Sequence, residues 1–232
     1  MAFFQDSQPA RQPFLNAPAA VLWLIGALLA AHAVREMLPG DLSREVLDQF
    51  AFIPARYSGG IAAPGLLEQT VTFVSYTFVH SGLAHAGLNS LWLLAFGPSV
   101  ARRLRTARFF AFYVVCAIAA AAAHLISDWG SFIPVVGASG AISGLMAAAI
   151  RILYGSRLLM FTGRAPLAPI LSRPVLLFTA IWTAVNIVVG TLGLGFTREY
   201  ELIAWVAHLG GYFAGLLLIG LFDKRRPAAP SA

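Results

Sequence analysis

Six long stretches of apolar residues, separated by short polar segments, run along the chain. An α-helix that crosses the roughly 30 Å of a bilayer core needs about 20 such residues. We therefore predict membrane-spanning helices over residues 18–34, 81–100, 109–126, 134–153, 174–194 and 202–222. The second and fourth stretches carry polar residues among glycine and alanine, whereas the others are more uniformly apolar. The pattern predicts an all-α membrane protein, a bundle of six transmembrane helices.

The composition favours a membrane protein over a water-soluble one. Of the 232 residues, 59% are hydrophobic and 11% are charged, whereas soluble domains carry about 25% charged residues. So much apolar surface excludes a soluble fold and intrinsic disorder, and the single cysteine, Cys116, excludes a disulfide scaffold. The net charge of +6 fits basic loops that stay in the cytoplasm. We therefore expect the lipid bilayer, and not nucleic acid, as a partner.

The arginines predict the orientation of the helices. The loops after the second and fourth predicted helices are basic, with Arg102, Arg103, Arg105, Arg108, Arg151, Arg157, Arg164 and Arg173. Because basic loops remain cytoplasmic, both termini are expected inside. We predict a flexible cytoplasmic tail over residues 1–17, a membrane domain over residues 18–222 with a long outside loop at about 35–80, and a cytoplasmic tail over residues 223–232.

Two polar residues inside the predicted helices lie at a similar depth. Ser139 is about five residues into the fourth helix, roughly 7 Å below its outer edge, and His208 is about six residues into the sixth, roughly 9 Å below the same edge. Each is followed by two glycines four residues apart. Gly140 and Gly144 follow Ser139, and Gly211 and Gly215 follow His208. Such pairs let helices approach closely. A hydroxyl next to an imidazole is the arrangement that activates a serine nucleophile.

Polar side chains of the second predicted helix add a third component. His85 and Asn89 are four residues apart and share a helix face, and His80 lies about a turn further out. Side chains of these types can donate hydrogen bonds to a developing oxyanion. An interhelical hydrogen-bond pair is the simpler alternative for His85 and Asn89.

Three other polar residues have simpler interpretations. Ser143 is expected to bond to a carbonyl one turn back in its own helix. Asn186 is interpreted as a packing hydrogen bond, and His124, near Asp128, as a residue at the outer rim. The histidines and the few acidic residues form no ligand set with recognisable spacing, so we expect neither a metal nor a cofactor.

Three motifs resemble those of the rhomboid family of intramembrane serine proteases. Residues 137–140 (GASG) are similar to the family's G-x-S-G, and residues 207–215 (AHLGGYFAG) to its A-H-x-x-G-x-x-x-G. Residues 80–89 (HSGLAHAGLN) are similar to its H-x4-H-x3-N. The resemblance implies Ser139 as nucleophile and His208 as general base. It also implies His85, Asn89 and the Ser139 N–H as the oxyanion site, and His80, Gly137, Gly140, Gly211 and Gly215 as supporting residues.

The resemblance implies an endopeptidase that cuts transmembrane segments of membrane proteins by a serine–histidine dyad, through an acyl-enzyme. We expect a multi-pass protein of a bacterial inner membrane, with its active site facing the periplasmic side. Substrates would be single-span proteins that enter sideways near the fifth helix. Ser143 stands where some members of the family carry an aromatic residue that packs on the histidine, so the sequence does not predict what orients the His208 ring.

Two alternatives from other classes remain at this point. The first is a catalytically silent relative that binds transmembrane segments without cutting them. The second is a small proton-coupled transporter that uses His85 and His208 as relays, which would predict an internal repeat or paired broken helices.

Overall fold

The computed structural model describes residues 17–61, 65–156, 166–192 and 204–223. Apart from residues 17 and 223, both predicted tails lie outside the described residues. The elements, in chain order, are α1 (Ala19–Met37), α2 (Gly40–Phe50), η1 (Pro54–Arg56), α3 (Leu66–Ser75), η2 (Tyr76–Phe78), α4 (Leu83–Leu104), α5 (Thr106–Ser127), α6 (Ser139–Ser156), α7 (Arg173–Leu192) and α8 (Trp205–Phe222). The fold is an all-α membrane bundle, as the sequence predicted.

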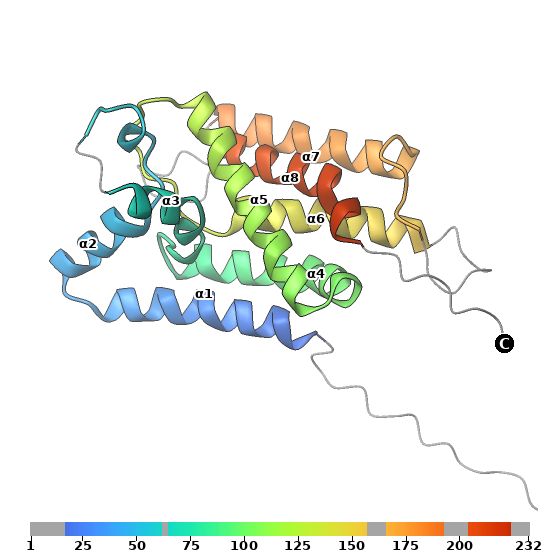
Figure 1. Cartoon of the computed structure of the whole chain (residues 1–232), viewed down its shortest axis with the longest axis horizontal. Helices are drawn as coiled ribbons and strands as arrows, with labels where there is room; N and C mark the ends of the chain where they lie inside the picture. The colour runs from blue at the N-terminus through green and yellow to red at the C-terminus, as the bar shows by residue number, and fades with distance from the viewer. Residues whose placement is uncertain (1–16, 62–64, 157–165, 193–203, 224–232) are drawn as a thin grey trace, which may run out of the picture.

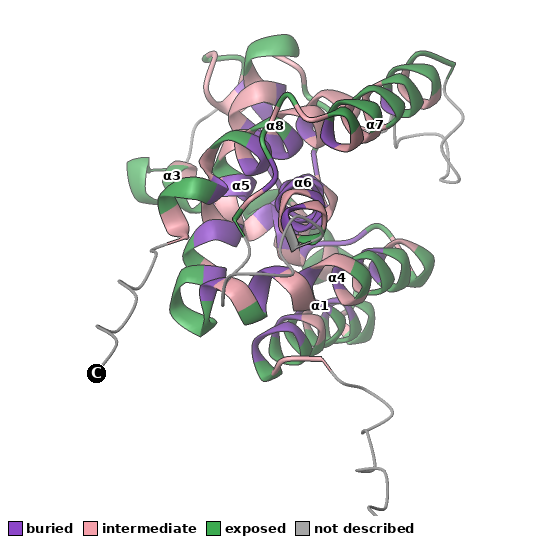
Figure 2. Cartoon of the chain, turned by 90° about the vertical axis from the view of Figure 1, so that its right-hand side faces the viewer, coloured by how far each residue is buried: buried purple, intermediate pink, exposed green. Residues whose placement is uncertain are grey.

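Helix α6 forms the centre of the bundle, with α4, α5, α7 and α8 packed around it. Its ribbon is mostly buried in Figure 2, where it is seen end-on between the other helices. The buried residues are small or apolar, such as those of residues 145–150. A helix that is apolar on every side is stable only when other helices surround it. Helix α1 packs on α4 at the edge of the bundle (Figure 1).

The predicted outside loop is folded and lies at one end of the bundle, where α2 and α3 gather (Figure 1). Phe52, in this segment, forms an isolated antiparallel bridge with Val135: the Phe52 N–H donates to Val135 O at 3.1 Å and the Val135 N–H to Phe52 O at 2.8 Å. The Gly137 N–H donates to Tyr76 O at 2.9 Å. These bonds hold the chain extended just before α6, and they fix where that helix begins.

The helix boundaries differ from the predicted ones where these contacts act. The fourth predicted span begins at residue 134, but α6 begins at Ser139, because Val135 is paired with Phe52 and the chain bends at residues 137–138. Likewise α8 begins at Trp205, so His208 is its fourth residue. Both side chains therefore lie in the first turn of their helices, Ser139 at its start and His208 at its end. Within the described ranges, α1, α5, α7 and α8 are long and apolar enough to cross a membrane, while the apolar stretch of α6 is shorter.

Asp223, the first residue of the predicted cytoplasmic tail, lies at the C-terminal end of α8. Asp223 caps α8 and pairs with Arg103 of α4: Nε donates to Oδ1 at 3.1 Å and Nη2 to Oδ2 at 2.6 Å. The two side chains are 6% and 9% exposed, respectively. This bidentate guanidinium–carboxylate pair links the C-terminal ends of α4 and α8.

Replacing Asp223 with alanine is expected to lower the free energy of unfolding by about 3–5 kcal/mol, because Arg103 is left buried without its carboxylate. The measurement is denaturant or thermal unfolding of the purified protein in detergent. Glu36→Ala is the control, since the Arg35–Glu36 pair at 3.3 Å leaves Glu36 58% exposed and such pairs contribute less than about 1 kcal/mol. Equal losses in the two variants would contradict a structural role for the buried pair.

Candidate active site

Ser139 and His208 are in direct contact. The Ser139 Oγ lies 2.8 Å from His208 Nε2, although 69 residues separate the two in the chain. Both side chains line a cavity of about 440 Å³. His85, in the first turn of α4, lines the same cavity. Three helix N-termini therefore converge on one cavity, and the positive ends of helix dipoles favour negative charge there.

Glycines make the contact between α6 and α8 possible. A Cβ at Gly211 would collide with the backbone carbonyl of Gly140, and one at Gly215 with that of Gly144. A Cβ at Gly140 would lie 2.7 Å from the Ala120 Cβ of α5 and 3.4 Å from the Ala207 carbonyl oxygen. The two helix backbones thus touch, as small-residue pairs permit. This close crossing brings Ser139 to His208.

His85 and Asn89 form the opposite wall of the cavity, beside Gly137. Gly137 has a φ of +101°, and a Cβ there would lie 2.5 Å from His85 Nε2 and 3.6 Å from Asn89 Nδ2. Glycine is needed at this position for both its backbone conformation and the room it leaves. The His85 imidazole and the Asn89 amide therefore lie directly against the backbone that leads into Ser139.

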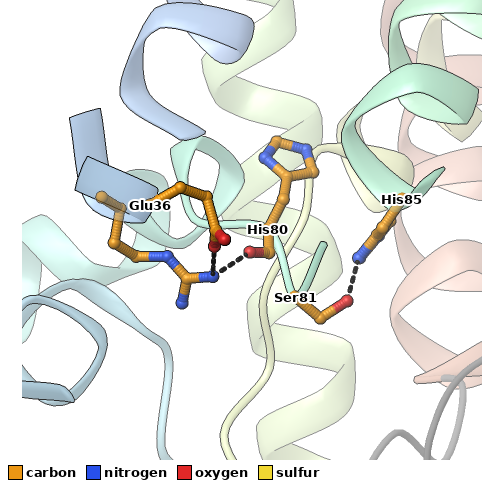
Figure 3. Close-up of polar contacts among 5 residues, drawn as sticks. Glu36, His80, Ser81 and His85 are labelled. Atoms are coloured by element: carbon orange, nitrogen blue, oxygen red, sulfur yellow. Dashed lines mark hydrogen bonds and ion pairs between the residues drawn. The ribbon is translucent and has the colours of Figure 1, made fainter. Parts of the chain in front are cut away.

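Hydrogen bonds hold both of these side chains in place. His85 Nδ1 lies 3.0 Å from Ser81 Oγ (Figure 3), and Asn89 Nδ2 donates to the His85 carbonyl at 3.1 Å. When the Ser81 hydroxyl donates to Nδ1, the proton of the neutral ring lies on Nε2, which faces Gly137. In that tautomer His85 presents a hydrogen-bond donor next to Ser139.

His80 lies behind His85 and does not line the cavity. Its ring is fully buried and packs edge-on against the His85 ring, with centroids 5.1 Å apart. Its carbonyl accepts a hydrogen bond of 2.7 Å from Arg35 Nη2 of α1 (Figure 3). Burial, with a smaller contribution from His85, lowers the pKa of His80 to about 3. A neutral, enclosed ring at this place supports His85 from behind.

Three residues outside the expected site are now placed. The Ser143 hydroxyl donates to the Ser139 carbonyl at 2.8 Å, which confirms the simpler interpretation of that residue. His124 lines the cavity together with Asp128. The His124 Nδ1 lies 3.4 Å from the Asp128 carboxylate. Asn186 forms a hydrogen bond between helices, as its interpretation as a packing hydrogen bond implies, and the partner is a residue of the candidate site: its Oδ1 lies 2.9 Å from His208 Nδ1. Asn186 lies eight residues from the outer end of the fifth predicted helix, roughly 12 Å deep, so its depth alone does not identify His208 as its partner.

These features define an integral membrane protein of the all-α class, with a serine–histidine pair in an internal cavity. Residues 67–225 match the family model described as the Rhomboid domain. The match covers more than half of the chain, and the chain belongs to the rhomboid family.

Two curated relatives are similar over much of the chain. The mitochondrial rhomboid protein 1 of Saccharomyces cerevisiae is 27% identical over 154 residues, which are 63% of this chain and 40% of the yeast protein. RHOMBOID-like protein 5 of Arabidopsis thaliana is 25% identical over 238 residues, which are 90% of this chain and 72% of the plant protein. The chain thus spans well under half the length of its yeast relative.

Proposed function

We propose that this protein is a serine endopeptidase that cuts transmembrane segments of membrane proteins. The observation that carries the proposal is the 2.8 Å contact between Ser139 Oγ and His208 Nε2 in a cavity. A serine hydroxyl is a poor nucleophile until a neighbouring base takes its proton. Membership of the rhomboid family supports the same chemistry.

In the proposed reaction, His208 takes the proton of Ser139 as the Oγ attacks the scissile carbonyl. The tetrahedral intermediate then collapses to an acyl-enzyme, and the protonated His208 gives its proton to the leaving amine. A water molecule, activated by the same imidazole, releases the acid product. Each step uses one base in two roles, so a serine–histidine dyad is sufficient.

Three donors are available for the oxyanion. Ser139 is the first residue of α6, so its N–H is among those that have no partner within the helix. The His85 ring and the Asn89 amide flank it across Gly137. Donors that are fixed before the reaction stabilise the developing charge, and removing one such donor typically costs about 10²–10³ in turnover.

The substrate must be locally unwound to react, because the carbonyls of a helix are already hydrogen-bonded. We infer that the cavity opens on the outer side of the membrane. His85 lies in the first turn of α4, whereas Arg102 and Arg103 lie in its last turn, and basic helix ends remain cytoplasmic. The assignment to a bacterial inner membrane stays a prediction.

A fluorescent phosphonate that reacts with activated serines tests the proposal. The purified full-length protein in detergent is expected to become covalently labelled, and Ser139→Ala is expected to lose all labelling. Ser143→Ala is the matched control, since this serine lies one turn further along α6 and bonds to a backbone carbonyl. It is expected to keep its labelling within a few fold.

Two outcomes would overturn the proposal. One is a folded wild-type protein that takes no label, which would favour a catalytically silent member of the family. The other is labelling that persists in Ser139→Ala, which would place the reactive group elsewhere. Unfolding temperatures of all three proteins show whether each is folded.

A further inference from the structure

Helix α7 leaves most of its surface exposed and buries few side chains. It is largely exposed in Figure 2, and its buried residues are Val175 and Asn186. An amide is an expensive group to bury in a bilayer unless it is hydrogen-bonded. Asn186, which is 4% exposed, meets this condition through two contacts, one within α7 and one to α8.

The first contact fixes which way the amide points. Asn186 Nδ2 donates to the Trp182 carbonyl at 2.9 Å. A carbonyl oxygen can only accept, so the NH₂ group of Asn186 must face it. The amide oxygen is thereby directed away from Trp182 and toward His208.

The second contact then fixes the proton on the imidazole. Asn186 Oδ1 lies 2.9 Å from His208 Nδ1. An amide oxygen has no proton to give, so Nδ1 must be the donor. In a neutral ring with its proton on Nδ1, Nε2 carries the lone pair. That atom is the one that faces Ser139 Oγ at 2.8 Å.

We propose that Asn186 is the positioning residue that holds His208 in the tautomer and ring orientation that a general base for Ser139 requires; this rests on the proposed function. Soluble serine proteases place a carboxylate at the same ring nitrogen. Here a neutral amide does the same work, and it avoids a buried charge inside the membrane. The Nδ1–H remains a donor to Asn186 when the ring becomes an imidazolium, so the contact persists through the reaction.

The orientation of the His208 ring therefore does not depend on the position that Ser143 occupies. The Ser143 hydroxyl donates to the Ser139 carbonyl. The imidazole is instead held by Asn186 of α7. The chain of hydrogen bonds runs from Ser139 through His208 and Asn186 to the Trp182 carbonyl.

Asn186→Leu tests the proposal, because leucine has the same number and branching of side-chain heavy atoms but no acceptor. With a cleavable transmembrane substrate, kcat is expected to fall by about 10²-fold, the range of general-base contributions, while KM changes by less than about threefold. Asn186→Asp, which restores an acceptor, is expected to return kcat to within about tenfold of the wild type.

The matched control is Thr179→Val. Thr179 Oγ1 lies 2.9 Å from the Tyr212 hydroxyl, so this variant also removes a polar contact between α7 and α8, at a distance from the imidazole. It is expected to leave kcat within about threefold. If Thr179→Val loses as much activity as Asn186→Leu, the effect is a loosened helix and the positioning role is refuted. Wild-type turnover in Asn186→Leu would refute that role as well.

Nitrogen NMR of the protein labelled with ¹⁵N-histidine reads the tautomer without any reaction. The chain has five histidines, and the His208 signals are assigned by their loss in His208→Gln. The wild type is expected to show the proton on Nδ1, and Asn186→Leu to shift the ring toward the other tautomer. A wild-type proton on Nε2 refutes the proposal. This readout stands even if the wild type proves inactive, an outcome that would overturn only the proposed peptidase function.

Discussion

Replacing His208 with alanine is expected to lower the turnover of a transmembrane substrate by about 10³-fold or more, because no base then takes the Ser139 proton. The imidazole is Ser139's hydrogen-bond partner at 2.8 Å. Substrate binding is expected to change little, since the ring acts on the reacting hydroxyl. Initial rates of cleavage in proteoliposomes, over a panel of single-span substrates, measure the effect.

The control for this variant is His124→Gln. His124 lines the same cavity but pairs with Asp128, and we expect its loss to cost less than tenfold. The double variant Ser139→Ala/His208→Ala is expected to be no slower than either single variant, because residues that act as one unit are not additive. Additive losses, or His208→Ala retaining a tenth of wild-type turnover, would refute the assignment of the base.

Replacing Gly211 with alanine is expected to separate α6 from α8 and to cost both stability and activity. The new Cβ would collide with the Gly140 carbonyl. This carbonyl is part of a helix backbone, so it cannot rotate away as a flexible side chain could. Overpacking costs about 1–3 kcal/mol, and more where the obstacle is rigid. Since Gly140 follows Ser139 directly, the separation also lengthens the contact between Ser139 and His208.

Gly220→Ala is the matched control in the same helix, because a Cβ at Gly220 would meet no atom within 4 Å among the described residues beyond its own stretch of helix. Alanine is favoured over glycine in a helix by about 1 kcal/mol, so this variant is expected to be as stable as the wild type or slightly more so. Unfolding temperature and phosphonate labelling are measured on both. A Gly211→Ala protein that matches Gly220→Ala in both measurements would show that the crossing tolerates a wider spacing.

Much of the site was predictable because its chemistry stands out from an apolar background. Ser139, His208, His85 and Asn89 are polar residues in predicted membrane helices, where each such residue is costly. Counting 1.5 Å per residue placed the first two at one level. The glycine spacing then indicated which helices touch, because backbones approach only where side chains are absent.

The residues that the sequence did not explain are those whose role depends on a partner from another helix. In the sequence, Asn186 is a single amide in an apolar segment, and nothing in that segment indicates that it faces His208. Asp223 reads as the start of a tail, yet it is buried against Arg103. Arg151, counted with the loop arginines, lies within α6 and donates to the Leu216 carbonyl at 2.7 Å.

The sequence alone determined the six apolar segments and the polar residues within them, because the bilayer sets the length of a crossing and penalises every polar group inside it. Only the tertiary structure decided where α6 begins and what supports the imidazole. The Phe52–Val135 bridge and the bend at residues 137–138 keep the chain out of a helix until Ser139, which no local pattern predicts. Each successive residue turns a helix by about 100°, so packing between helices, and not sequence spacing within one, selects the partner of Asn186.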